Sequence, residues 1–158
     1  MNEYTAAAVE AAKLAGKVLT DGLEGEFEML LKGDIDIVTK LDRESERTIT
    51  SYLKEKFPSH NVLAEEGTEV DNSSDHVWYV DPLDGTTNYA YRLPWFAVSI
   101  GLHKNGLPLS GVVYNPANGE LFYAERGGGA FLNGIRLHVS DRDDLKKSLL
   151  VTGFPYYV

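Results

Sequence analysis

The spacing of apolar residues changes about halfway along this chain. Up to residue 57 they recur at helical intervals, in an Ala-rich segment from Thr5 to Leu19 and again from Asp42 to Phe57. Beyond Trp95 they form short runs separated by Asn-Gly pairs, which supply the positive φ angles of tight hairpins. Helices first and strands later predict separate layers of helix and sheet, that is, an α+β fold.

The individual elements can be assigned from the same pattern, with Pro58 ending the second helix. The residues expected to face the core are Ala7, Ala11, Leu14 and Val18 in the first helix, and Ile49, Tyr52 and Leu53 in the second. Strands are expected at residues 35–39, 61–65, 77–80, 95–103, 109–114, 120–125, 130–132, 135–139 and 149–152, with a polar loop at 67–76.

The composition excludes several classes of function. The 158 residues suffice for one domain with a hydrophobic core. A net charge of −9, from 24 acidic and 15 basic residues, is unsuited to nucleic acid, whose phosphates require clustered Lys and Arg. The absence of cysteine rules out disulfides and thiolate metal sites. No signal peptide or membrane span is visible, so we expect a cytoplasmic protein without a membrane partner.

Residues 81–88 place several reactive groups directly after a continuous apolar run. We expect a buried strand, then a turn stiffened by Pro82, then the start of a helix. In that geometry the carboxylates of Asp81 and Asp84 and the carbonyl of Leu83 converge on one point. Hard oxygen ligands of this kind suit Mg²⁺, which binds few protein carboxylates and keeps several waters.

The same segment offers hydrogen-bond donors to an anion. Gly85, Thr86 and Thr87 begin the expected helix, so their backbone N–H groups have no partner within it and can bind a phosphate. The alternative is that Asp84 only caps the helix and Asp81 is a turn residue, because an Asp before a helix is usually a cap. Both acids together with a Gly-Thr-Thr run favour a site.

Two further acidic segments can contribute. Glu65 and Glu66 end an expected strand, where neighbouring side chains point to opposite faces, so one can face a metal and the other solvent. Without the rest of the pattern they would be the polar start of a loop. Asp42 begins the second helix and is an N-cap by default, with Thr39 as a bonding partner. Asp42 could also orient a metal-bound water, and the spacing alone does not decide between these roles.

A competing motif is excluded by its spacing. Haloacid dehalogenase-like phosphatases carry Asp-x-Asp-Gly-Thr, in which the first Asp is a nucleophile and both acids share one face of a strand. Here Asp81 and Asp84 are three positions apart, and their segment follows two helices instead of the first strand of a domain. We therefore reject a nucleophilic role for Asp81.

Taken together, these motifs resemble those of the inositol monophosphatase family. The resemblance rests on residues 80–88, 95–101, 64–67, 36–39 with Asp42, and 128–134, in the family's order. It spans nearly the whole chain. It implies a layered α/β/α/β/α sandwich, in which residues 1–158 form a single N-terminal α+β domain with helices packed on a largely antiparallel sheet.

The resemblance also implies a magnesium-dependent phosphomonoesterase with two or three Mg²⁺ ions, which Mn²⁺ can replace. By this resemblance the metal ligands are Glu65, Asp81, the Leu83 carbonyl and Asp84, the catalytic residues are Glu65, Thr86 and Asp42, and the phosphate contacts are Asp84, Gly85, Thr86 and Thr87. Asp81 would be shared by two ions, and Asp42 would act through Thr86 on the attacking water. No covalent enzyme intermediate is needed.

Within the family, residues 85–88 with 96–101 look most like the inositol monophosphatase branch, which implies inositol monophosphate as substrate and a homodimer. Fructose-1,6-bisphosphatase and 3'-phosphoadenosine phosphatase activities are the alternatives. In all cases the expected partner is a small phosphate monoester.

The length of the chain differs from the family pattern. Family members continue into a second α/β half, whose Trp-Asp motif completes the metal site, and we expect that half to be absent here. The apolar residues 154–158 suggest a chain cut before a partner segment; the alternative is a terminal strand on its own sheet. A truncated, non-catalytic domain that binds metal or self-associates through an uncovered edge or face is therefore a second hypothesis.

Overall fold

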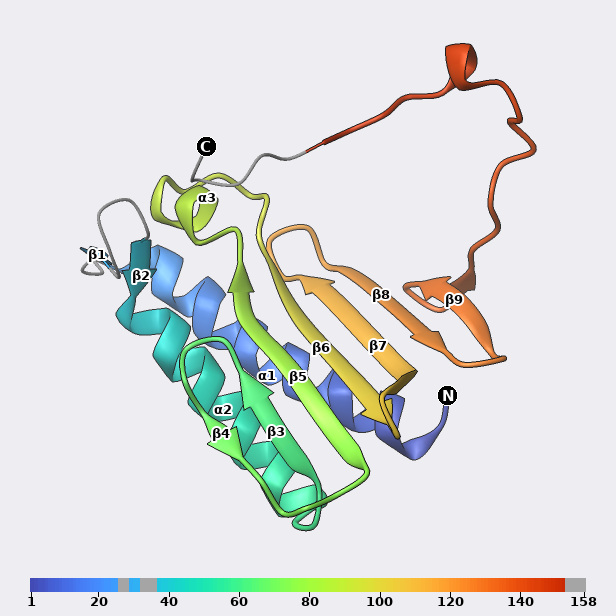
Figure 1. Cartoon of the computed structure of the whole chain (residues 1–158). Helices are drawn as coiled ribbons and strands as arrows, with labels where there is room; N and C mark the ends of the chain where they lie inside the picture. The colour runs from blue at the N-terminus through green and yellow to red at the C-terminus, as the bar shows by residue number, and fades with distance from the viewer. Residues whose placement is uncertain (26–28, 32–36, 153–158) are drawn as a thin grey trace.

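The computed structural model describes residues 1–25, 29–31 and 37–152. In this part of the chain, eight strands form one sheet in the order β10-β9-β8-β7-β6-β5-β3-β4, and helices α1 and α2 cover one of its faces (Figure 1). The predicted α+β layering is therefore confirmed. The elements are α1 (Glu3–Glu24), β1 (Met29–Leu31), β2 (Ile37–Thr39), α2 (Lys40–Lys56), β3 (Asn61–Ala64), β4 (Glu69–Val70), β5 (His76–Asp84), α3 (Thr86–Ala90), β6 (Ala97–Lys104), β7 (Leu107–Asn115), β8 (Glu120–Glu125), β9 (Gly129–Leu132), β10 (Ile135–Arg136) and the short 3₁₀ helix η1 (Leu145–Lys147).

The sheet is antiparallel except at the pairing of β3 with β5, which is parallel within the described residues. Hairpins are present at the predicted Asn-Gly pairs, but at Asn118-Gly119 Gly119 alone has a positive φ, of 67°. Asn105 and Gly106 have φ angles of 51° and 73°, and Asn133 and Gly134 have 48° and 84°, so both central residues of these two turns are left-handed. Strands β6 to β10 follow one another through hairpins, whereas the chain passes from β3 to β5 through β4 at the edge of the sheet.

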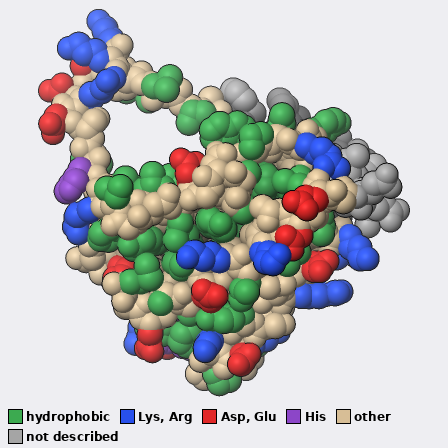
Figure 2. Space-filling view, turned by 180° about the vertical axis from the view of Figure 1, so that it is seen from behind, with side chains coloured by type: hydrophobic (Ala, Val, Ile, Leu, Met, Phe, Trp, Pro, Cys, Tyr) green, Lys and Arg blue, Asp and Glu red, His purple; other side chains and the backbone are tan. Residues whose placement is uncertain are grey.

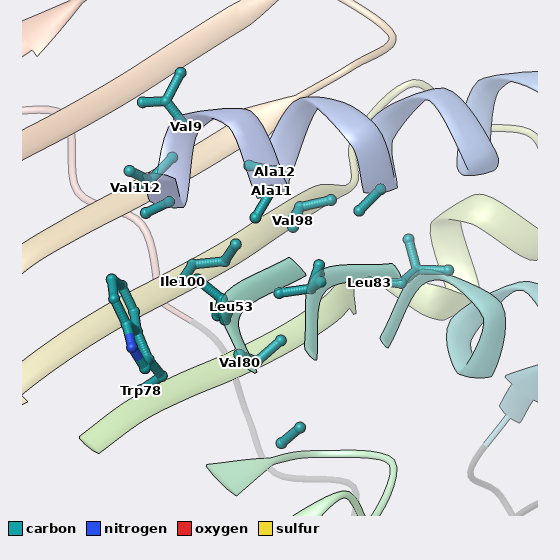
Figure 3. Close-up of a cluster of buried hydrophobic side chains, with 14 of the residues drawn as sticks. Val9, Ala11, Ala12, Leu53, Trp78, Val80, Leu83, Val98, Ile100 and Val112 are labelled. Carbon is teal, nitrogen blue, oxygen red and sulfur yellow. The ribbon is translucent and has the colours of Figure 1, made fainter. Parts of the chain in front are cut away.

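The core lies between the two helices and the sheet (Figure 3). Small side chains on α1 allow the helix to lie close to the strands; they are Ala8, Ala11, Ala12 and Ala15, followed by Leu19. The predicted stripe was partly wrong, because Leu14 is 38% exposed on the outer side of the helix. In α2 the prediction held for Ile49 and Leu53, which are fully buried, and Tyr52 is half-buried.

Several expected boundaries were wrong. The predicted turn at Pro82 is a bulged continuation of β5, which runs on to Asp84. The polar loop at 67–76 contains β4, and the strand expected at 135–139 ends at Arg136. Residues 149–152 are not a strand but exposed, irregular chain, with Leu149 98% and Val151 99% exposed; within the described ranges no strand pairs with them. Residues 35–36 and 154–158 lie outside the described residues.

The surface and the C-terminal segment of the described chain have the following features. On the face in Figure 2, acidic and basic side chains are interspersed. After β10, residues 137–152 leave the body of the molecule as an extended segment (Figure 1). Of the helices in the described ranges, not one has the length and apolar character to cross a bilayer.

Candidate active site

The parallel pairing of β3 with β5 brings two carboxylates together. Ala64 lies opposite Val80 in the register, and the Glu65 N–H donates to the Val80 carbonyl at 3.0 Å. The next residues, Glu65 directly after β3 and Asp81 within β5, therefore lie side by side. The sequence placed both acids at strand ends, and the parallel register explains why they meet.

Asp81 is held in an environment that disfavours its charge. Burial, the charge of Glu65, a hydrogen bond with the Glu65 side chain and the charge of Asp84 raise the pKa of Asp81 to about 7. The Leu83 N–H, which donates to Asp81 Oδ1 at 3.1 Å, acts in the opposite direction. Carboxylates that repel one another in this way are stabilised by a cation placed between them.

The β5 bulge places the third acid. The register with β6 shifts between Asp81 and Asp84, so that Asp84 lies opposite Ala97 with its side chain exposed. The Leu83 carbonyl was expected to be free, but it accepts a hydrogen bond from Thr86 Oγ1 at 3.0 Å. A carbonyl has a second lone pair, so this contact leaves one acceptor position on Leu83.

Helix α3 begins at Thr86, and its N-cap is Gly85, not Asp84. The capping role considered for Asp84 is therefore wrong. Gly85 has a φ of 88°, and a Cβ there would lie 2.9 Å from the Trp95 carbonyl, so both backbone angle and space require glycine. The α3 helix has five residues, so its dipole is small; what it offers an anion is the N–H groups of its first turn.

Asp42 lies behind Thr86, as the resemblance implied. Thr86 Oγ1 lies 3.2 Å from Asp42 Oδ1 and can donate either to it or to Leu83. Asp42 is 2% exposed and is the third residue of α2, so the default N-cap role is wrong. Burial of Tyr89, and second the charge of Asp42, raise the pKa of Tyr89 to about 12. The predicted contact from Thr39 lies outside the described side chains.

Two contacts of α2 were missed by the sequence reasoning. Ser45 Oγ donates to the Pro82 carbonyl at 3.0 Å, and the Glu46 carboxylate accepts the N–H groups of Glu66 and Thr68. The sequence held a signal, because Ser45 and Glu46 lie on the helix face that carries Ile49. Polar side chains on the buried face of a helix normally form hydrogen bonds with neighbouring elements.

Two hollows adjoin the site. Glu65 and Asp81 line one of about 400 Å³, together with Leu63, Tyr79 and Ser99. Asp84 and Gly85 line another of about 290 Å³, next to Trp95. The three acids thus surround the end of β5 on two sides, with the apolar face of the sheet next to the first hollow.

The donor set suits a hard divalent cation. Each ion implied by the resemblance would take two carboxylates of this chain, Glu65 with Asp81 and Asp81 with Asp84, and the first also the Leu83 carbonyl. Within the described residues, no three Asp, Glu, His or Cys side chains gather around one point. Two-carboxylate sites are nevertheless what Mg²⁺ uses, because it keeps several waters.

Comparison with known proteins agrees with this geometry. The model of the inositol monophosphatase family matches residues 1–158. The chain is 43% identical over 156 residues to an inositol monophosphatase of Mesembryanthemum crystallinum, covering 96% of this chain and 58% of the relative. It is 41% identical to the Nus factor SuhB of Pasteurella multocida, covering 99% of this chain and 60% of the relative. The solved structure of an inositol monophosphatase from Anabaena superposes with a TM-score of 0.84 at 42% identity, covering 97% of this chain and 56% of that one.

The chain therefore belongs to the inositol monophosphatase family. It spans about 58–60% of the length of the two relatives named above.

Proposed function

We propose that the protein hydrolyses a small phosphate monoester in a magnesium-dependent reaction, with inositol monophosphate as the substrate. The observation that carries this proposal is that Glu65 lies beside Asp81 where β3 pairs with β5. Thr86 follows shortly after Asp81 in the chain, and its hydroxyl contacts the buried Asp42. Family membership supports the same reaction class.

The acids would hold the metal ions. Glu65, Asp81 and the Leu83 carbonyl are the proposed ligands of one Mg²⁺, and Asp81 with Asp84 those of a second. When bound, Mg²⁺ lowers the pKa of water and neutralises charge on the phosphate and the leaving oxygen. The repulsion that raises the pKa of Asp81 supports this assignment, because bound cations would relieve it.

Thr86 would orient the nucleophilic water, and Glu65 would act as the base that takes its proton. When the Thr86 hydroxyl donates to Asp42, its lone pairs are available to accept a hydrogen bond from water. Asp42 is buried and acts as a fixed acceptor that sets the direction of that hydroxyl. Glu65 is exposed on the other side of Asp81 and would take the proton.

The phosphate would lie at the end of β5, against the N–H groups of Gly85, Thr86 and Thr87 and next to Asp84. Gly85 lets an anion approach the backbone closely because it has no side chain. The leaving alcohol would lie toward the exposed side of the sheet.

Phosphate release from inositol monophosphate, with and without Mg²⁺, tests this function. Thr86→Ala should lower kcat by roughly 100-fold or more, as removal of a group that positions a nucleophile does, whereas Thr48→Ala should not. Thr48 is a suitable control because, among the described residues, its hydroxyl donates to the Glu44 carbonyl one turn earlier in α2 and to no group of the site. Turnover that is independent of Mg²⁺, or equal in Thr86→Ala and the unaltered chain, would contradict the proposal.

The same assay chooses the substrate. Inositol monophosphate, fructose 1,6-bisphosphate and 3'-phosphoadenosine 5'-phosphate should be compared by kcat/KM, because these are the substrates that the family resemblance of the sequence leaves open. A folded chain that binds Mn²⁺ but hydrolyses none of them would favour the second hypothesis, a metal-binding domain without catalysis. Sedimentation of the same sample tests the proposed homodimer.

A further inference from the structure

The inner face of α2 contacts the three backbone segments that carry the candidate site. Asp42, Ser45 and Glu46 stand at positions i, i+3 and i+4 and so project from the same side of the helix. All three are buried. Asp42 accepts from Thr86 at the start of α3, and Ser45 donates to the Pro82 carbonyl within the β5 bulge. The third residue, Glu46, contacts the turn between β3 and β4.

Glu46 binds this turn with both carboxylate oxygens. Oε2 accepts the Glu66 N–H at 2.6 Å, and Oε1 accepts the Thr68 N–H at 3.0 Å. The side chain is only 4% exposed, so water has little access to these bonds. Hydrogen bonds to a charged acceptor are the stronger kind, and a buried carboxylate is retained only where such bonds satisfy it.

The turn is tied to β5 by the Glu65 N–H bond to the Val80 carbonyl and to α2 by Glu46. Its internal bonds are short-range, from the Ala64 N–H to the Thr68 carbonyl and from the Gly67 N–H to the Ala64 carbonyl. Glu65 is exposed within it, whereas Asp81 lies inside the longer strand β5 and pairs with Ser99 of β6. The position of Glu65 beside Asp81 therefore depends on how the turn is held.

We infer that Glu46 is a positioning residue, whose buried carboxylate fixes the β3–β4 turn so that Glu65 stays opposite Asp81. Glu46 thereby connects the helix layer to the sheet layer, because it projects from α2 onto the turn between β3 and β4. The inference deepens the proposed function, on which it rests for the statement that the Glu65–Asp81 pair then receives a divalent cation.

Glu46→Gln is the informative variant. It keeps the size of the side chain and one acceptor oxygen, but it sets an NH₂ group against the second backbone N–H. Two measurements on the whole chain are compared: amide hydrogen exchange without metal, and Mn²⁺ affinity by electron paramagnetic resonance. In Glu46→Gln we expect selective acceleration of exchange at Glu66 and Thr68, and roughly 10- to 100-fold weaker Mn²⁺ binding, the range seen for residues that orient metal ligands.

Ile49→Val is the matched control. Ile49 is fully buried one turn further along the same face of α2, and the change removes one methyl group without altering the Glu46 contacts. Exchange at the two amides and Mn²⁺ affinity should both stay as in the unaltered chain.

Each outcome decides something. Unchanged exchange and affinity in Glu46→Gln, or equal losses in Ile49→Val, would overturn the inference, the second because the effect would then be general destabilisation. If the unaltered chain binds no Mn²⁺, the metal-dependent function fails, and the exchange measurement still decides whether Glu46 fixes the turn.

Discussion

At the residue scale, the charge of Asp81 works against the fold when no cation is bound. The pKa of Asp81 is raised from 3.8 to about 7, so the native state keeps a proton that the unfolded chain releases. The free energy of unfolding therefore falls as pH rises between about 4 and 7. Functional sites often contain a group whose pKa is shifted strongly from its ordinary value.

Replacing Asp81 by Asn should therefore stabilise the metal-free chain. Asn keeps the acceptor for the Leu83 N–H but does not ionise. At pH 8 with a chelator we expect the thermal midpoint to rise by about 2–4 °C, which for a chain of this size corresponds to about 1 kcal/mol. The exposed Asp141→Asn serves as control. Midpoints of the two variants that change alike with pH would contradict the assignment.

At the element scale, α1 lies so close to β7 that one position tolerates no side chain. A Cβ on Gly16 would lie 2.6 Å from the Tyr114 ring and 3.0 Å from Pro116. Both neighbours are rigid groups, so relief requires the helix to move. Thr5 and Ser110, whose hydroxyls lie 2.7 Å apart in the core, fix the other end of the same contact.

Gly16→Ala should therefore destabilise the chain, although alanine favours a helix by about 1 kcal/mol over glycine. Overpacking costs about 1–3 kcal/mol and outweighs that gain. Gly111→Ala is the control, because a Cβ there meets no atom within 4 Å. Urea unfolding measures both, and a Gly16→Ala chain as stable as the control would show that α1 shifts freely.

A second contact between elements is pH-sensitive. His60 stacks on His76 with ring centres 4.4 Å apart, and its Nδ1 accepts the Trp78 Nε1–H at 3.1 Å, which requires a neutral ring. Burial, followed by the charge of His76, lowers the pKa of His60 from 6.5, against the nearby acids Asp75 and Glu3; Lys104 lowers it further. The unfolded chain thus binds the proton first, so this stability is complete above pH 6.5 and declines as pH falls below it.

Since Asp81 produces the opposite slope over part of this range, His60→Gln should be studied in the Asp81→Asn background. Urea unfolding between pH 5 and 7.5 should show a smaller loss of stability at acid pH in the His60 variant. The exposed His138→Gln is the control. If both His variants lose stability in parallel with their parent, His60 does not titrate as described.

These elements also show what the sequence could and could not predict. The Ala-rich helix, the hairpins and the acids at residues 65, 81 and 84 follow from local spacing and turn chemistry. The continuation of β5 through Pro82 does not, because a bulge is set by pairing with β6. Likewise the helical spacing puts Glu46 on the buried face of α2, but only the fold shows that its partner is the β3–β4 turn.

At the scale of the whole molecule, the two faces of the sheet differ. Alternation along the strands buries Trp78 and Val80 under the helices and leaves Tyr79 42% exposed on the other face, where Asp81 also lies. The acids thus stand at one end of a face that also carries exposed apolar side chains, among them Leu63, Val113 and Phe122. A cation bound between these acids would offset their mutual repulsion and so stabilise the fold.

We therefore expect Mn²⁺ to raise the thermal midpoint of the whole chain at pH 7.5. At a concentration 100 times the dissociation constant, binding to the folded state alone adds about 2.7 kcal/mol, which for this size corresponds to a rise of about 5–10 °C. Asp81→Asn should remove the rise, because the shared ligand is lost, whereas Asp21→Asn, which affects only the exposed ion pair with Lys17, should keep it. An equal rise in both variants would show that the ion acts elsewhere on this acidic surface, and that Glu65 and Asp81 repel each other without serving as a cation site.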